Sequence, residues 1–262
     1  MKLKLVKASQ GLMWVRQGIL ACRKQPLGFV GLLGLFGCVA LLMVGLPARI
    51  GSILVVGVMP VMWMGFMLAT RRVLTGQRIT LSVMFESLKG PEAPKRQFAI
   101  LGGVYVLVTL LIMQVAQWLG PDPDALEKIM TTTEDAAALF GNPLVQEDML
   151  WRMALTLPVS LIFWHTPALI LWARLPVPKA LFFSAVATWR NIGAFITYGL
   201  GWLGIMLVIA LLDRALLAIV PEPLIANVAA IMASMWLAAA FYASLYFTVV
   251  DCFEPQQRVP EV

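Results

Sequence analysis

The sequence predicts an all-α integral membrane protein with six membrane-spanning helices. Of its 262 residues, 60% are hydrophobic and only 13% are charged. The apolar residues gather in six long runs, and most basic residues lie in the segments between alternate runs. Soluble domains carry about 25% charged residues, so a water-soluble fold would lack the polar side chains needed to cover this much apolar surface. In a bilayer that need disappears, because lipid is the solvent.

The chain starts with a basic segment and a predicted amphipathic helix. Polar residues recur every seven positions, in the pairs Ser9/Gln10, Arg16/Gln17 and Arg23/Lys24. Leu12, Val15 and Ile19 lie between these polar positions, and Pro26 is expected to separate the helix from the first span. We expect this helix to lie in the membrane interface.

Six segments are long enough to span a membrane. A hydrocarbon core of about 30 Å needs about 20 apolar residues in a helix. The segments are residues 27–46, 50–70, 98–119, 153–173, 194–212 and 224–250. Together they predict one polytopic membrane domain over residues 1–262. The first run exceeds the apolar core of a signal peptide, about 7–15 residues, so we expect an uncleaved span.

The basic residues predict the orientation. With the N-terminus inside, the cytoplasmic segments hold 16 Lys and Arg residues, and the other side holds only Arg49, Lys128, Arg152 and Arg214. Because an excess of Lys and Arg marks the cytoplasmic side, we expect a bacterial inner-membrane protein with both termini in the cytoplasm. The net charge of +6 does not indicate a nucleic-acid partner, since the basic residues do not form one face.

Two further cytoplasmic segments show helical periodicity. Leu81, Met84, Phe85 and Leu88 follow the i, i+3, i+4, i+7 pattern. The segment from Pro178 carries a predicted apolar face of Leu181, Phe182, Ala185, Val186 and Trp189. We expect both to be interfacial helices, like the first. The order of interfacial helix, outward span and inward span would then occur three times, as a loose repeat.

The outer loop 120–151 is acidic, with Lys128 as its one basic residue. A solvated loop with short helical turns at 126–130 and 135–140 is one interpretation. A mouth that attracts cations is the other.

Small residues predict where helices approach closely. The first span carries Gly28, Gly31, Gly34 and Gly37, and the last carries Ala226, Ala230, Ala233, Ala240 and Ser244. The stretch Gly199–Gly204 matches G-x-G-x-x-G, but it lies inside an apolar run and not between a strand and a helix. It therefore predicts helix packing and no dinucleotide site.

A candidate intramembrane polar site consists of His165, Thr166, Gln114 and Gln117. His165 is either a neutral imidazole bonded to a neighbouring helix, or to the Phe163 carbonyl that Pro167 leaves free, or a protonatable group on a pathway. No acidic residue lies at membrane depth to pair with it. The two glutamines either bond between helices or line a polar vestibule.

Five basic residues are candidate contacts for lipid head groups: Arg71, Arg72, Arg174, Lys179 and Arg190. The three cysteines, Cys22, Cys38 and Cys252, lack metal-ligand spacing, so we expect neither a disulfide nor a metal. No P-loop, zinc-protease motif or serine-nucleophile motif is present. We therefore expect no catalytic residues and no cofactor.

Two stretches resemble an uncharacterised family of bacterial inner-membrane proteins. Near the N-terminus they are Ala8-Ser9-Gln10-Gly11, Trp14, Arg16, Gly18 and Pro26. In the second half they are Pro167-Ala168-Leu169, Trp172, Pro176, Lys179-Ala180, Phe182-Phe183-Ser184, Arg190-Asn191, Ala194-Phe195 and Tyr198. The resemblance implies a six-span membrane protein and supplies no activity, ligand or site.

Two functions therefore stay open. The first is a non-enzymatic membrane component that interacts with lipids or with other membrane proteins, including further copies of itself. The basic interfacial segments and the scarcity of polar residues in the spans favour it. The second is a transporter or channel for ions or small solutes, with its site near His165. The threefold repeat, the acidic loop and the two prolines of the fourth span, Pro158 and Pro167, favour that one.

Overall fold

The structure is a computed structural model that describes residues 2–46, 50–133, 136–219 and 223–254. Arg49, Glu134 and Asp135 lie outside these ranges, and so does Arg258, which was counted among the cytoplasmic basic residues. The Ala226 side chain, named above as a packing residue, is not described either.

The described residues form six helical segments long and apolar enough to cross a membrane, which confirms the all-α class with six candidate spans. They are α2 (Pro26–Val44), α3 (Ile50–Leu74), α4 (Lys95–Leu119), α7 (Pro143–Phe163) with α8 (Thr166–Ala173), α10 (Ile192–Ile219) and α11 (Pro223–Cys252).

The fourth and fifth spans differ from their predicted bounds. The fourth was predicted as one helix over 153–173, but it begins at Pro143 and is interrupted at Trp164 and His165. Asn142 starts it, because its side chain accepts a hydrogen bond of 3.0 Å from the Leu144 amide. The fifth, predicted to end at 212, continues to Ile219, since charged side chains are compatible with a helix outside the hydrocarbon.

The acidic outer loop is largely helical. It contains α5 (Pro123–Thr132) and α6 (Ala136–Gly141). Asp122 begins α5, where its carboxylate accepts a hydrogen bond from the Asp124 amide at 3.3 Å and Pro123 occupies the first turn. The predicted turn at 126–130 therefore lies within a longer helix, and the one predicted at 135–140 corresponds to α6, of which Asp135 lies outside the described residues.

A short helix precedes each hairpin of spans, so the predicted threefold order is present. These helices are α1 (Gln10–Lys24), η1 (Leu81–Leu88) and α9 (Val177–Arg190). The middle one is a 3₁₀ helix of eight residues, in which Val83 and Met84 are buried while Leu81 and Phe85 are exposed. The three units thus share an order of elements and differ in helix type and length.

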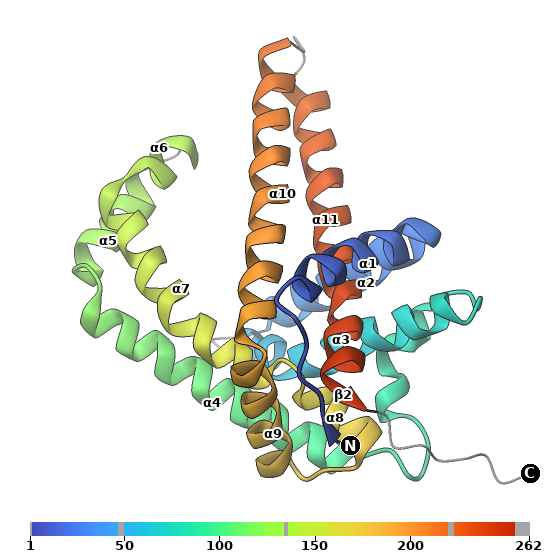
Figure 1. Ribbon diagram of the computed structural model, residues 1–262. Coiled ribbons are helices and arrows are strands. Elements are labelled where there is room, and N and C mark those ends of the chain that lie inside the picture. Colours follow the sequence, from blue (N-terminus) through green and yellow to red (C-terminus); the bar gives the residue numbers. More distant parts are fainter. Residues whose placement is uncertain (1, 47–49, 134–135, 220–222, 255–262) are drawn as a thin grey trace, which may run out of the picture.

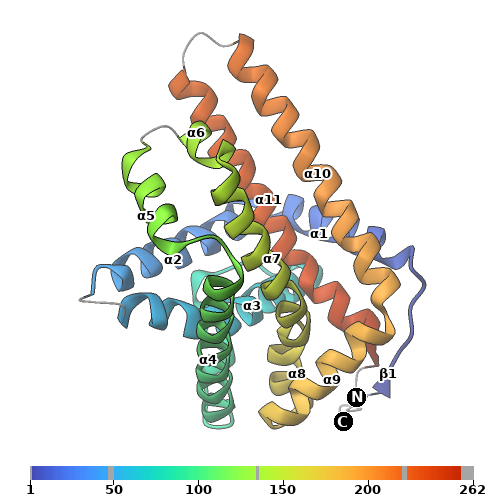
Figure 2. The same cartoon turned by 90° about the vertical axis from the view of Figure 1, so that its left-hand side faces the viewer.

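The three hairpins α2/α3, α4/α7 and α10/α11 point in different directions from a common end (Figures 1 and 2). We call this end the base. It comprises α1, η1, α8, α9 and the adjoining parts of the long helices, which are residues 26–32, 61–74, 95–101, 161–165, 192–202 and 239–254. The base contains nearly all of the buried side chains in the described residues. The remaining parts of the hairpins, the arms, expose mostly apolar side chains.

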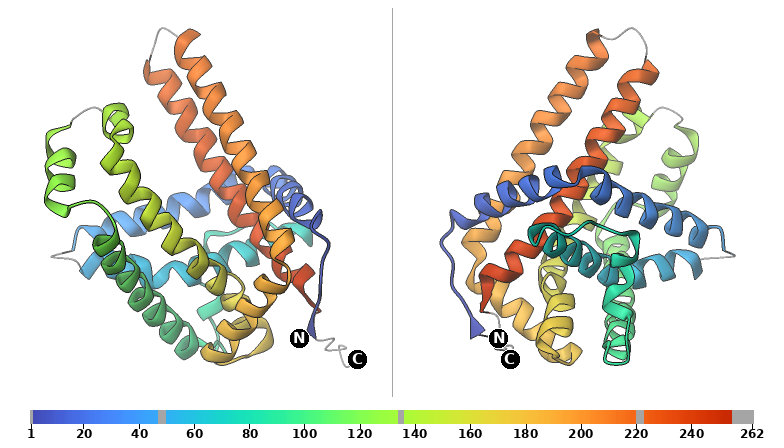
Figure 3. Two further views of the ribbon diagram at one scale, coloured as in Figure 1. Left: turned by 60° about the vertical axis from the view of Figure 1, so that its left-hand side comes forward. Right: turned by 90° about the vertical axis from the view of Figure 1, so that its right-hand side faces the viewer.

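Helix α1 crosses α11 and packs against it (Figure 3). A Cβ at Gly11 would collide with the Ala194 carbonyl of α10, and one at Gly18 would collide with Ser244 and with the Ala240 carbonyl of α11. The closest partner of the small residues of the last span is therefore α1. Two of the four glycines of the first span, Gly34 and Gly37, face open space, so they do not pack against another described helix of the same chain.

The first and last described segments of the chain are joined at the base. Strand β1 (Lys2–Leu3) pairs antiparallel with β2 (Phe253–Glu254). The Asn191 side chain accepts from the Val6 amide at 2.8 Å and donates to the Lys4 carbonyl at 3.1 Å. The Asp251 carboxylate accepts from the Gln10 amide group at 2.6 Å and from the Trp14 indole at 2.8 Å. These bonds fix the N-terminal segment and α1 against the last span.

Candidate functional site: an apolar cleft between α7 and α10

The interruption of the fourth span is held in place by α9. At the break, the Ser184 hydroxyl accepts a hydrogen bond of 3.0 Å from the His165 backbone amide. One turn further along α9, the Thr188 hydroxyl donates to the Leu161 carbonyl at 3.2 Å. A helix break leaves backbone groups without intrahelical partners, and here side chains of the neighbouring helix supply them. Two polar side chains four residues apart on α9 therefore stabilise the change of direction between α7 and α8.

His165 lies at this break with no exposed surface. Its ring meets Phe195 and Phe253 nearly edge to face, with centroid distances of 5.6 and 5.4 Å. Neither ring nitrogen makes a hydrogen bond to the described residues. Aromatic side chains meet the ring on two sides, and the backbones of Ser184 and Thr248 lie within its reach. A neutral imidazole bonded to a neighbouring segment and a protonatable group on a pathway both stay predictions. Thr166 is also buried and donates to the Ile162 carbonyl of its own turn at 3.2 Å.

An aromatic cluster lies beside the break and joins three helices. Trp164 meets Phe195, Tyr198 and Phe241 with centroid distances of 5.9, 5.8 and 5.9 Å. Its indole also donates to the Thr248 hydroxyl of α11 at 3.1 Å. Tyr198 and Ser244 share a hydrogen bond of 2.6 Å. The polar atoms of this cluster are thus satisfied within the protein, and its rings provide an apolar wall.

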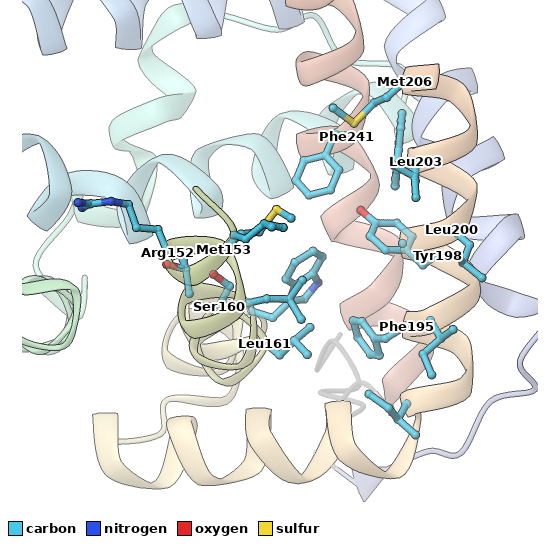
Figure 4. Close-up of a pocket in the computed structure, with 18 of the residues that line it drawn as sticks. Arg152, Met153, Ser160, Leu161, Phe195, Tyr198, Leu200, Leu203, Met206 and Phe241 are labelled. Atoms are coloured by element: carbon cyan, nitrogen blue, oxygen red, sulfur yellow. The ribbon is translucent and has the colours of Figure 1, made fainter. Parts of the chain in front are cut away.

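That wall closes one end of a large cleft between α7 and α10, with a volume of about 1240 Å³ (Figure 4). Small-molecule pockets usually measure about 300–1,000 Å³, so this space suits a long or branched molecule. Met153 and Leu157 line it from α7, and Leu200, Leu203 and Met206 line it from α10. These five rim residues are exposed, so the cleft opens onto the apolar outer surface of the arms.

Few polar groups reach this cleft. Thr156 and Ser160 line it from α7, and Gln146 and Arg152 lie toward its outer end. Arg152 pairs with Asp148 at 2.7 Å and contacts the Met113 sulfur of α4 at 2.9 Å. Its side chain extends away from the aromatic wall (Figure 4). The cationic group therefore belongs to the contact between α4 and α7, and the interior of the cleft carries no charge.

The four residues of the predicted polar site do not come together. His165 and Thr166 are enclosed at the base, whereas Gln114 and Gln117 are exposed on the arm of α4. Neither glutamine side chain makes a hydrogen bond within the described part of the chain.

Four of the predicted head-group contacts lie in the base and Arg174 lies in the turn between α8 and α9, and the five differ in whether a carboxylate pairs with them. Arg72 pairs with Glu86 at 2.8 Å, and Arg174 pairs with Glu92 at 3.7 Å. Arg71, Lys179 and Arg190 are exposed and make no ion pair with any described residue. Of the five residues, only Arg71, Lys179 and Arg190 carry a surface charge that no described carboxylate balances.

The chemistry available to the cleft is that of an apolar binding site. Its walls hold no candidate nucleophile with an adjacent base, and the described residues contain no group of three His, Cys, Asp or Glu side chains able to hold a metal ion. Aromatic, aliphatic and thioether side chains bind hydrocarbon through dispersion, and methionine adapts its shape to irregular ligands.

Sequence reasoning missed the cleft because each lining residue resembles an ordinary residue of a membrane span. Gly201 packs against Leu12 and Val15 of α1, as expected of helix packing, but Gly199 and Gly204 face open space and Gly199 lines the cleft. Three glycines close together in one apolar helix were the available signal. Of these, Gly199 lies on the cleft wall, Gly204 faces open space elsewhere, and Gly201 is covered by α1.

Comparison with known proteins supports the membrane assignment. The chain is 34% identical over 265 residues to a probable inner membrane protein of Burkholderia thailandensis, and the match covers 98% of this chain and 96% of the relative. The relative's name states a membrane location and no activity. No protein-family model and no solved structure matches the chain.

Proposed function

The chain belongs to the same family as the probable inner membrane protein of Burkholderia thailandensis, and from that premise we propose that it is a non-enzymatic membrane component that holds phospholipid acyl chains between α7 and α10. The resemblance noted in the sequence is confirmed by this relationship, and so is a multi-pass inner-membrane location. The relationship itself specifies neither a ligand nor an orientation in the membrane.

One observation carries the proposal: a large, uncharged cleft opens sideways between two helices that are apolar enough to span a membrane. Hydrocarbon surrounds such helices on every side, so an opening of this kind is in contact with acyl chains and not with water. The exposed rim of leucine and methionine offers them no barrier.

Transport of a polar solute has weaker support. Such a site needs several polar groups that converge near the middle of the membrane. His165 and Thr166 are fully buried, with His165 between two aromatic rings, whereas Gln114 and Gln117 are exposed on another helix. We therefore propose acyl-chain binding in preference to transport of a polar solute.

We further propose that the base faces the cytoplasm, with both termini on that side. The basic residues Arg71, Lys179 and Arg190 lie there, exposed and without an ion pair in the described residues. Lys and Arg accumulate on the cytoplasmic side and are attracted to anionic lipids. These three residues are the better candidates for phosphate contacts, because Arg72 and Arg174 already have carboxylate partners.

The cleft is tested by filling it without disturbing the fold. In Gly199→Phe, the new side chain enters open space on the cleft wall. Gly204→Phe is the matched control, because Gly204 lies on the same helix, also faces open space and does not line the cleft. Both variants and the parent are reconstituted with a phospholipid that carries a photoreactive group on its acyl chain.

After irradiation, we expect lipid adducts on lining peptides that contain Met153 and Leu203. Gly199→Phe should reduce these adducts several-fold, and Gly204→Phe should leave them unchanged. Equal labelling in all three proteins would refute the site. Crosslinks from the cleft to a second copy of the chain, in place of lipid adducts, would identify an oligomer interface and would equally refute it.

A further inference from the structure

Helix α9 buries its small and polar side chains and exposes its aromatic ones. The buried side consists of Val177, Ala180, Ser184, Ala187 and Thr188. The exposed side carries Phe182, Phe183 and Trp189, with 63%, 43% and 79% of their surface accessible. Of the apolar face predicted from the sequence, Phe182 and Trp189 are exposed, whereas Leu181, Ala185 and Val186 are half-buried.

The exposed aromatic residues form a stripe with basic ends. Phe182 and Trp189 are seven residues apart, which places them on the same side of the helix two turns from each other. Lys179 precedes this stripe and Arg190 follows it, both exposed and without an ion pair in the described residues. Apolar side chains flanked by free cations are typical of helices that lie on an anionic membrane surface.

The orientation of α9 agrees with that pattern. It crosses the N-terminal end of α10, close to the end of the cleft that adjoins the base (Figures 2 and 4). Ile192, Ile196 and Leu200 of α10 continue the exposed apolar surface that begins at Trp189. If α10 crosses the bilayer, α9 therefore lies along its surface, and the stripe is continuous with the lipid-facing side of a span.

We propose that α9 is an in-plane membrane anchor that recognises anionic phospholipid. Phe182 and Trp189 insert among the acyl chains just below the phosphates, where aromatic side chains are enriched. Lys179 and Arg190 bind the phosphates. The placement in the cytoplasmic leaflet rests on the orientation proposed above, but the depth of the stripe depends neither on that orientation nor on occupancy of the cleft.

The depth of the stripe can be measured with nitroxide labels on single cysteines. The background is Cys38→Ser, because Cys38 is the exposed one of the three. Cys22 and Cys252 are buried, and burial raises the pKa of the Cys22 thiol to about 12, which keeps it unreactive. Labels are placed by Phe182→Cys and by Trp189→Cys. Met130→Cys, on an exposed position of α5, gives the aqueous reference.

In phosphatidylcholine vesicles containing phosphatidylglycerol, both α9 labels should collide readily with oxygen. They should collide several-fold less with a water-soluble nickel complex than the Met130→Cys label does. Lys179→Gln with Arg190→Gln should make the Phe182→Cys label more accessible to nickel, and so should omission of phosphatidylglycerol.

Two results would overturn the anchor. Nickel access equal to that of the α5 label would place the stripe in water. Low access to both oxygen and nickel would show that protein covers it, as a partner surface. Insertion that is indifferent to the charge changes and to phosphatidylglycerol would overturn the recognition of anionic lipid.

Discussion

The base and the arms of this molecule have similar apolar character but pack very differently. In the base, several buried polar side chains bond to other segments: Ser184 to the His165 amide, Asn191 to the Val6 amide, and Ser244 to the Tyr198 hydroxyl. In the arms, Leu41 and Leu42 of α2 and Leu211 of α10 are exposed. Hydrocarbon is as favourable to leucine as another helix is, so close packing occurs where small and polar side chains permit it.

The two regions should differ most in how much stability is lost when a glycine is replaced by leucine. Gly18→Leu in the base should lower the free energy of unfolding by about 3 kcal/mol, because its side chain must displace α1 from Ser244 and Ala240. Gly34→Leu in an arm adds the same atoms to open space and should change stability by less than about 1 kcal/mol. Thermal unfolding of both variants in detergent measures the difference. Equal losses would show that the arm is packed as tightly as the base.

The two regions should differ less in how much stability is lost when a polar side chain is removed. Asn191→Ala removes the acceptor of the Val6 amide and should cost about 2 kcal/mol, with faster hydrogen exchange over residues 2–6. Thr109→Ala is the matched change in an arm, where the hydroxyl bonds only to the Tyr105 carbonyl of its own helix. It should cost under about 0.5 kcal/mol. If hydrogen exchange over residues 2–6 did not change in Asn191→Ala, Asn191 would not be the residue that fixes the N-terminal segment.

The smallest effect is expected at His165, although it is the one histidine of the chain. Its ring nitrogens have no hydrogen bond in the described residues and its neighbours are aromatic. Replacement of an unbonded buried polar group by an apolar one of similar shape is nearly neutral or stabilising. His165→Phe should therefore keep the melting temperature of the parent or raise it. A marked decrease would indicate a partner for the imidazole, and the aromatic enclosure would need revision.

The arms were predictable from the sequence, because length and hydropathy alone identify a helix that must face lipid. The base was less predictable, since its contacts join residues far apart in the chain. No residue near Gly18 in the sequence indicates that it packs against Ser244. Likewise, no residue near Ser184 indicates that its hydroxyl bonds to the His165 amide. The outward aromatic face of α9 shows the same limit. Periodicity identified Phe182 and Trp189 as one face, but it did not indicate that Leu181, assigned to the same face, packs against the core.

The candidate site was not predictable for a related reason. Polar residues drew attention to His165, Gln114 and Gln117, which the fold separates. The cleft instead lies between α7 and α10, which diverge from each other (Figure 1), and the aromatic cluster around Trp164 lines it. Divergence of two helices is a property of their packing at the base and leaves no pattern in the residues of the cleft.

Labelling of single cysteines from each side of the membrane measures whether the base lies at the cytoplasmic surface while the arms cross the hydrocarbon. Arg78→Cys reports on the exposed turn between α3 and η1, and Met130→Cys reports on α5 at the far end of the arms. We expect an impermeant maleimide to label only Met130→Cys in bacterial cells whose outer membrane has been permeabilised. In inverted vesicles it should label only Arg78→Cys. Labelling of Arg78→Cys from the outside, or of both positions from one side, would contradict this arrangement.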